Sequence, residues 1–281
     1  AAGGCGAIIV NTVDRAQQLY RRLRAGLPPD VPMVLFHARF PADERLVHEQ
    51  RVLQFFGPDG ERPQRALMVA TQVAEQSLDI DFDFMLSDLA PIDLLLQRAG
   101  RLHRHQRVRQ DEHRQARLWV AGLSPADPKE LRQVFKKTAW SFVYDAYILG
   151  RTWALLQQEP VLKLPEDIDR LVQSVYGDTP LPDGLEQAAQ DFIEIESYGE
   201  YRARVNKERQ ESFNVAIDPE GEPAVAYNGK PRGNEEGDGL GLENRTRLGR
   251  ASVTLIPVEV VDQGWKIGDI VFQSDQSLDD E

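Results

Sequence analysis

Short apolar runs that alternate with amphipathic segments constrain the fold of this chain more than any other feature. The runs cover residues 7–10, 31–36, 66–70, 82–86 and 116–120, and segments with helical spacing of apolar residues separate several of them. Strands of this kind, alternating with helices, are typical of a parallel sheet covered on both faces. Ligands of such sheets gather at the carboxyl ends of the strands, so the residues that follow each run are the first candidates for function.

The pattern changes after Pro125. We expect one long helix over residues 129–158 and further helices over 165–175 and 184–211, with strands over 252–261 and 267–272. The Gly- and Glu-rich stretch 218–245 predicts a mobile loop, and residues 274–281 form an acidic tail. This gives an α/β sheet domain over 1–124, a helical linker region over 125–211 and a small β-containing domain over 212–281.

Charge is divided unevenly along the chain. The net charge is −12, yet residues 1–120 hold 16 basic and 15 acidic residues, and all of the basic ones are arginine. Seven arginines fall between Arg98 and Arg117. The planar guanidinium fork suits phosphate, although a solvated arginine-rich surface is the alternative interpretation.

Location follows from what the composition excludes. The single cysteine, Cys5, excludes an internal disulfide framework and is typical of a reducing cytoplasm. No apolar run approaches the length of about 18 residues that a membrane span needs, and no signal peptide is recognisable. We therefore expect a cytoplasmic protein without a membrane partner.

The segment Gln97-Arg98-Ala99-Gly100-Arg101-Leu102-His103-Arg104 predicts phosphate chemistry. If it is helical, Arg101 and Arg104 lie three residues apart on one face and point the same way. Two such guanidinium groups can hold a triphosphate and stabilise charge that develops on the γ-phosphate, a contribution of about 10³–10⁵ in rate.

A second segment, Ala70 to Asp81, follows a predicted strand. Thr71 is placed to bond a nucleic-acid phosphate, which positions a strand without reading its sequence. Asp79 can accept a hydrogen bond from a ribose hydroxyl. The alternatives are a helix N-cap for Thr71 and a turn for Asp79.

Together these segments resemble the second RecA-like domain of superfamily-two helicases. More narrowly, the chain resembles the helicase–nuclease family that type I CRISPR interference complexes recruit. The residues that carry this narrower resemblance are His37-Ala38-Arg39-Phe40, Glu75 to Asp83, and Asp88-Leu89-Ala90-Pro91 leading into the arginine segment; Ser77 and Gln72 also favour this subgroup over RNA helicases.

The resemblance implies a role for individual residues. The backbone of single-stranded DNA would meet residues that follow the first three strands: Asn11, Thr12, His37, Arg39, Thr71 and Gln72. The nucleotide would meet Gln76, Ser77 and Asp79, and its phosphates would face Gln97, Arg101 and Arg104. For Arg98 we expect a structural ion pair, and packing or hydrogen bonding is the alternative for His37.

Several expected motifs do not occur in this sequence. There is no G-x-x-x-x-G-K-[ST] phosphate loop, no His-Asp nuclease pair and no convincing metal-ligand set. By the resemblance, ATP with Mg²⁺ would be held mainly by an N-terminal half that carries a RecA-like and a nuclease domain. Since the sequence opens directly on a core strand, as a truncation or a separate gene product would, we predict that this segment alone does not hydrolyse ATP.

The sequence leaves three functions open. The first is the C-terminal half of an ATP-dependent single-stranded DNA translocase in CRISPR interference, with the CRISPR surveillance complex as a partner. The second is an RNA helicase of the same superfamily. The third is a non-catalytic interaction module, in which the arginines only dock a partner.

Overall fold

The computed structural model describes residues 3–75, 78–122, 128–159, 161–215, 259–261, 264–267 and 270–273. Its contacts divide the chain into two units, residues 1–205 and 206–281, and each is described by itself. Within the described ranges, no helix is both long and apolar enough to cross a lipid bilayer.

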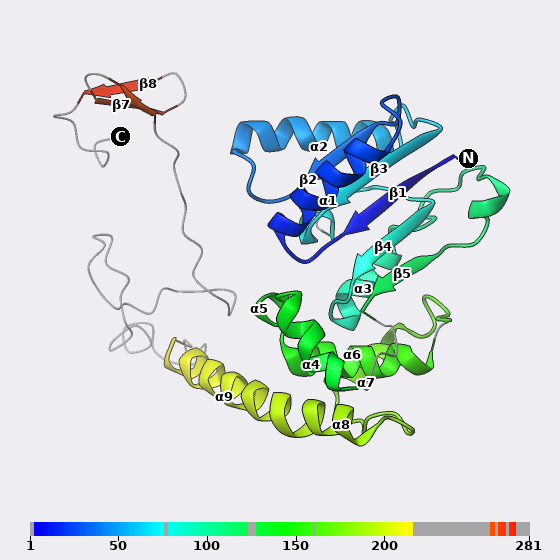
Figure 1. Ribbon diagram of the computed structural model, residues 1–281, viewed down its shortest axis with the longest axis vertical. Coiled ribbons are helices and arrows are strands. Elements are labelled where there is room, and N and C mark those ends of the chain that lie inside the picture. The colour runs from blue at the N-terminus through cyan, green and yellow to red at the C-terminus, as the bar shows by residue number, and fades with distance from the viewer. Residues whose placement is uncertain are drawn as a thin grey trace, which may run out of the picture. The chain divides into compact units, whose positions relative to one another are not determined.

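The first unit is built on a five-stranded parallel sheet with the order β2-β3-β1-β4-β5 (Figure 1). The strands are β1 (Gly4–Ile9), β2 (Met33–Phe36), β3 (Arg65–Ala70), β4 (Phe84–Asp88) and β5 (Leu118–Ala121). Each lies within about two residues of an apolar run in the sequence. The predicted RecA-like α/β class is confirmed.

Helices α1 (Val13–Gly26) and α2 (Ala42–Phe56) cover opposite faces of this sheet. Alternate residues of a strand point to opposite faces. On β1, Ile8 packs against the cluster that contains Ala16 of α1, whereas Ile9 packs with Val52 and Phe56 of α2. The two clusters fix the sheet between two layers of helix.

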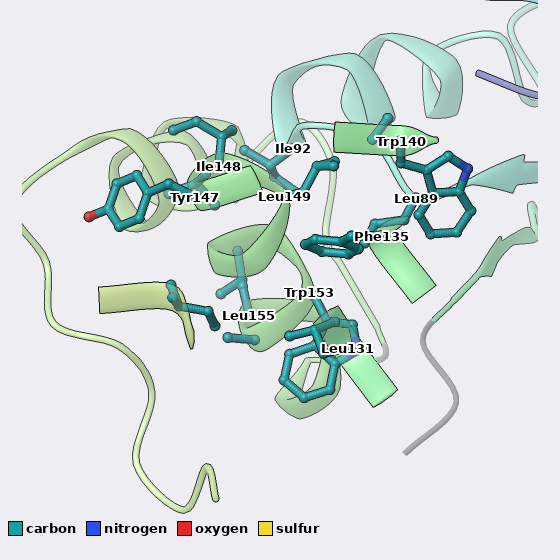
Figure 2. Close-up of a cluster of buried hydrophobic side chains, with 14 of the residues drawn as sticks. Leu89, Ile92, Leu131, Phe135, Trp140, Tyr147, Ile148, Leu149, Trp153 and Leu155 are labelled. Carbon is teal, nitrogen blue, oxygen red and sulfur yellow. The ribbon is translucent and has the colours of Figure 1, made fainter. Parts of the chain in front are cut away.

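A third and larger core joins the sheet to the helices that follow it. Helix α3 (Ile92–Ala99) contributes Ile92 and Leu95, and the later helices contribute Phe135, Trp140 and Leu149 to the same cluster (Figure 2). These helices are α4 (Pro128–Lys137), α5 (Trp140–Val143), α6 (Ala146–Gln158), α7 (Ile168–Tyr176), α8 (Gln187–Gln190), a π-helical segment (Asp191–Ser197) and α9 (Tyr198–Val215).

The single long helix expected over residues 129–158 is wrong, because the backbone leaves the helical region twice. Ala139 adopts a left-handed conformation with φ of 56°, and Tyr144 is extended. Asp145 then caps α6 by accepting a hydrogen bond from the Tyr147 N–H at 3.0 Å. Apolar spacing is preserved across both breaks, so periodicity alone does not reveal them.

The second unit contains β6 (Glu259–Val261), β7 (Gly264–Ile267) and β8 (Ile270–Gln273), which form an antiparallel sheet. The sequence predicted one strand over residues 267–272. The structure instead has two strands, because β7 ends at Ile267 and β8 begins at Ile270. The predicted loop 218–245 and the tail 274–281 lie outside the described residues. The domain limits at 124 and 211 stay predictions.

Two buried carboxylates, those of Asp81 and Asp83, bind the arginine-rich segment to the sheet. Asp81 accepts two hydrogen bonds from Arg109 Nη2 at 2.8 and 2.9 Å, and Arg62 Nη2 lies 2.9 Å from Asp83 Oδ1. Arg109 also pairs with Asp83, and Arg107 Nε lies 3.4 Å from Asp81 Oδ2. These arginines therefore form neither a solvated surface nor a phosphate site.

Asp83 remains ionised within this network. Burial raises the pKa of its carboxyl, but the Cys5 N–H, which donates to Oδ2 at 2.6 Å, and the guanidinium groups of Arg62 and Arg109 lower it further. The net effect is a pKa below the ordinary range. Because the unfolded chain binds this proton more readily, the network stabilises the fold above the unfolded pKa and loses its contribution as pH falls through the folded one.

We predict that Leu149→Ala lowers the free energy of unfolding by about 2–5 kcal/mol, because Leu149 is fully buried in the third core. Leu46→Ala is the matched control, since Leu46 is 62% exposed, and it should change stability by less than about 0.5 kcal/mol. Chemical denaturation followed by circular dichroism measures both. Equal effects of the two substitutions would contradict the described core.

We predict that Asp83→Asn destabilises the protein by about 3–5 kcal/mol at pH 7, because it leaves buried arginine charge without its partner. Asp30→Asn, which removes an exposed pair with Arg65, should cost no more than about 1 kcal/mol. The gap between wild type and Asp83→Asn should narrow as pH falls below the unfolded pKa of Asp. A gap independent of pH would refute an ionised Asp83.

Candidate nucleotide and nucleic-acid interface

The carboxyl ends of β2, β3, β1 and β4 lie side by side, and polar residues lie at or shortly after each of them. We call this set the strand-end ledge: His37, Thr71, Asn11 and Asp88, together with Thr12, Arg39 and Gln72. The parallel sheet alone brings them together, because all four strands point the same way. Residues separated by as many as 77 positions, such as Asn11 and Asp88, are in hydrogen-bond contact.

Asp88 organises the ledge at the end of β4. Its side chain is buried and accepts hydrogen bonds from the Asn11 N–H at 3.1 Å and from Trp140 Nε1 at 3.3 Å. Arg15 Nε also donates to it at 3.2 Å. Through Asp88, the loop after β1 is held against the sheet and against α5.

Thr12 begins helix α1 as its N-cap, with its hydroxyl accepting from the Arg15 N–H at 3.3 Å. Asp14 lies in the first turn of this helix. Asn11, one residue earlier, is buried and donates from Nδ2 to the Leu89 carbonyl at 2.8 Å. Thr12 is thus the more accessible of the two residues predicted to contact nucleic acid.

Thr71 and Gln72 join the middle strand of the ledge to its neighbours. The Thr71 N–H donates to the Phe36 carbonyl at 3.1 Å, and Gln72 Nε2 donates to the Asn11 carbonyl at 3.0 Å. Thr71 is buried and Gln72 is half-buried. The loop after β3 therefore holds the loops after β2 and β1 in register.

His37 is packed, and Arg39 is exposed beside it. The ring of His37 stacks on Phe40 at 4.1 Å, and Phe40 stacks in turn on His48 at 4.0 Å. Gln17 Nε2 lies 3.2 Å from His37 Nε2. Burial, followed by the charges of His48 and Arg39, lowers the pKa of His37, so the ring is neutral at pH 7. Of the two residues, only Arg39 presents charge to solvent.

The arginine segment does not continue helix α3, and the predicted helical pairing of Arg101 with Arg104 is wrong. Helix α3 ends at Ala99, Leu102 forms a parallel bridge with Phe82, and His103 has a φ of 49°. The backbone pairing with residue 82 competes successfully with helix propensity there. Both arginines nevertheless lie against the loop that follows β3.

Arg98 forms the internal ion pair that the sequence analysis expected. It is fully buried; its Nε donates to Glu75 Oε1 at 2.7 Å, and its Nη1 donates to Ser87 Oγ at 2.6 Å. Burial raises the pKa of Glu75, while the charge of Arg98 opposes that rise. Arg98 Nη2 also donates to the phenol oxygen of Tyr144 at 3.3 Å.

Arg101 is the half-buried cation of the segment. Its Nη2 donates to the Glu75 carbonyl at 3.2 Å, and among the described residues it forms no ion pair. Burial and then the charge of Arg104 lower its pKa, although Asp79 opposes this. An arginine that is partly desolvated, and that meets a neutral carbonyl where its neighbours meet carboxylates, is suited to an anionic ligand.

Arg104 and His105 both contact Asp79 at the surface. Arg104 Nε donates to Asp79 Oδ1 at 2.6 Å, and His105 Nε2 lies 2.9 Å from the same oxygen. Hydrogen bonds from His105 and Arg104 lower the pKa of Asp79. Gln97 is exposed near the end of α3, while Gln76 and Ser77 lie outside the described residues.

Four contacting residues were not selected from the sequence: Glu75, Asp88, His105 and Tyr144. Their partners are distant in the chain, as for Tyr144 and Arg98, which are 46 residues apart. Only the need of a buried arginine for a carboxylate pointed toward Glu75, without selecting it among the neighbouring acids.

Three comparisons place this chain among known proteins. The family model described as "CRISPR-associated nuclease/helicase Cas3, C-terminal" matches residues 2–107. The CRISPR-associated endonuclease/helicase Cas3 of Thermus thermophilus is 38% identical over 310 residues, which cover 93% of this chain and 32% of that relative.

Solved structures agree with the sequence match. T. fusca Cas3 with ATP superposes with a TM-score of 0.63 at 34% identity, over 77% of this chain and 24% of that one. A chain of a CRISPR RNA-guided surveillance complex in a pre-nicking state gives 0.57 at 34% identity, over 76% and 25%. The chain thus spans about a third or less of these relatives.

The strand-end residues and the arginine segment both lie within the matched range. In sequence and in fold, this chain corresponds to the C-terminal portion of the Cas3 helicase–nuclease family.

Proposed function

We propose that this chain is the C-terminal half of an ATP-dependent single-stranded DNA helicase that acts in CRISPR interference, where invading DNA is degraded. It supplies a second RecA-like domain, a helical linker region and a small accessory domain. Its partners are the N-terminal RecA-like and nuclease domains, single-stranded DNA and the CRISPR surveillance complex. The setting is the cytoplasm.

The observation that carries this proposal is the charge pattern around Glu75 and Asp79. Arg98 pairs with Glu75 and Arg104 pairs with Asp79, whereas Arg101 lies between them on a backbone carbonyl. A cation left uncompensated in this position fits the γ-phosphate of a nucleotide bound by a neighbouring domain.

The residues of this chain act mainly by charge and position. ATP supplies the phosphoryl group whose transfer to water drives the cycle, and the N-terminal half holds it together with Mg²⁺. Arg101 stabilises negative charge that develops on the phosphoryl oxygens. Arg104 exchanges Asp79 for phosphate, and Asp79 is then available to the ribose. Gln97 faces the phosphates in this proposal, and Gln76 and Ser77 keep the role in nucleotide binding that the family resemblance implies.

The strand-end ledge supports contact with a nucleic-acid backbone. Thr12, Gln72 and Arg39 are its accessible members, and Asn11, Thr71 and His37 hold the loops in place from beneath. Such contacts position a strand without reading its bases, so binding is tolerant of sequence and sensitive to salt.

We predict that Arg101→Ala reduces ATP turnover at least about a hundredfold in the enzyme assembled with the N-terminal domains, on the scale of arginine fingers. Arg114→Ala is the matched control, since Arg114 lies in the same arginine-rich stretch and, within the described residues, its side chain forms an exposed ion pair with Asp111. Steady-state phosphate release in the presence of single-stranded DNA measures both variants.

Two outcomes would each contradict a different part of this proposal. Turnover that survives Arg101→Ala would leave the arginines a docking role and favour a non-catalytic interaction module. DNA-stimulated ATP hydrolysis by residues 1–281 alone would contradict the proposal that this segment needs the N-terminal half.

We predict that Arg39→Ala weakens single-stranded DNA binding by the assembled enzyme and lowers the slope of log affinity against log salt by about 0.7, the share of one phosphate contact. Arg65→Ala is the control, because Arg65 lies at the amino end of β3, and the strand-end ledge lies at the carboxyl ends of the strands. Fluorescence anisotropy across a salt series gives both slopes, and an RNA of the same sequence serves as competitor. Preference for the RNA would favour an RNA helicase.

A further inference from the structure

The junction between α5 and α6 contacts both faces of the proposed motor at once. Tyr144 ends α5, and its phenol oxygen lies 3.3 Å from Arg98 Nη2. The side chain of Gln72 lies beside the same phenol, where it opposes the burial that raises the pKa of Tyr144. Arg98 belongs to the arginine segment, and Gln72 belongs to the strand-end ledge. One side chain of the helical region therefore joins the two.

The other partners of Arg98 all belong to the sheet domain. They are Glu75, the Ser87 hydroxyl and the Asp88 carbonyl, the last at 3.2 Å from Nη1. Arg98 is fully buried, so a donor that loses its acceptor cannot turn to water. Tyr144 is thus the contact through which the helical region acts on the position of this guanidinium.

Gln72 extends the connection toward nucleic acid. Its Nε2 donates to the Asn11 carbonyl at 3.0 Å, next to Thr12. On the other side, Glu75 Oε1 holds Arg98 and the Glu75 carbonyl holds Arg101. A path of polar contacts therefore runs from Asn11 through Gln72, Tyr144, Arg98 and Glu75 to Arg101.

The corner that carries Tyr144 is held in place from both ends. Trp140, four residues earlier, is buried and donates from Nε1 to Asp88 at 3.3 Å. Asp145, the next residue, accepts from Arg204 Nη2 at 2.8 Å. A fixed corner keeps the phenol oxygen where both partners meet it.

We propose that Tyr144 is a positioning residue that couples nucleic-acid binding at the strand-end ledge to ATP turnover at the arginine segment. This inference rests on the proposed function. The phenol touches neither the nucleotide nor the nucleic acid. It holds Arg98 and Gln72 in one arrangement, so that a movement of the strand-end ledge displaces the arginine segment.

The test is Tyr144→Phe in the enzyme assembled with the N-terminal domains, because this change removes one oxygen and keeps the ring. ATP turnover is measured with and without single-stranded DNA. We expect the ratio of stimulated to unstimulated turnover to fall at least about fivefold, the lower end of typical coupling between sites. Unstimulated turnover should stay within about twofold of wild type, since Arg101 keeps its place on Glu75.

Tyr176→Phe is the matched control. Tyr176, at the end of α7, donates its hydroxyl to Asp93 Oδ1 of α3 at 2.6 Å, so it also connects the helical region to the sheet domain. That contact avoids the ledge and the arginine segment. Tyr176→Phe should therefore keep the wild-type stimulation ratio, and thermal unfolding of both variants should show them folded.

The outcomes separate this inference from the function beneath it. A Tyr144→Phe enzyme with the wild-type ratio overturns the coupling role, as does a loss in which both turnovers fall by the same factor. An equal fall in ratio for Tyr176→Phe would also overturn it, by assigning the effect to general loosening. If single-stranded DNA does not stimulate ATP turnover by the wild-type assembly, the proposed function is wrong, and this inference, which rests on it, is wrong as well.

Discussion

The buried guanidinium of Arg98 is the interaction on which the rest of the site depends. A charge without any exposure to water must be matched by acceptors, and Arg98 finds them on three different segments, at Glu75, Ser87 and Tyr144. Removing one member of such a pair typically costs about 3–5 kcal/mol, because the remaining charge cannot be solvated. The loop after β3, the end of β4 and the end of α5 are therefore fixed relative to one another.

In this arrangement, arginines of one sequence segment have different roles. Arg98, Arg107 and Arg109 face carboxylates inside the protein, where their forks build the fold. Arg101 meets a carbonyl and forms no ion pair within the part of the chain that the structure describes. The same side chain thus serves structure or ligand binding according to whether an acid lies opposite it, and net charge along the chain does not distinguish these cases.

Local patterns predicted much of the sheet domain. Apolar runs predicted all five strands, and strand ends predicted where polar residues gather, because both depend on short-range sequence. The helix break at Ala139 was not predicted, because apolar spacing continues through it. The end of α3 at Ala99 was not predicted either. In both places a tertiary contact overrides helix propensity: Trp140 binds Asp88, and Leu102 pairs with Phe82. The partners of the buried charges were beyond sequence reasoning, because many acids lie within reach of an unfolded chain.

The third hydrophobic core has a consequence for how this protein can be divided. Its members come from both sides of residue 124: Leu89, Ile92 and Leu95 before it, and Phe135 and Leu149 after it. A fragment that stopped at the end of β5 would expose the apolar outer surface of α3 to water. The strands and the helices after them therefore form one packing unit, and a transfer into another protein succeeds only if both are included.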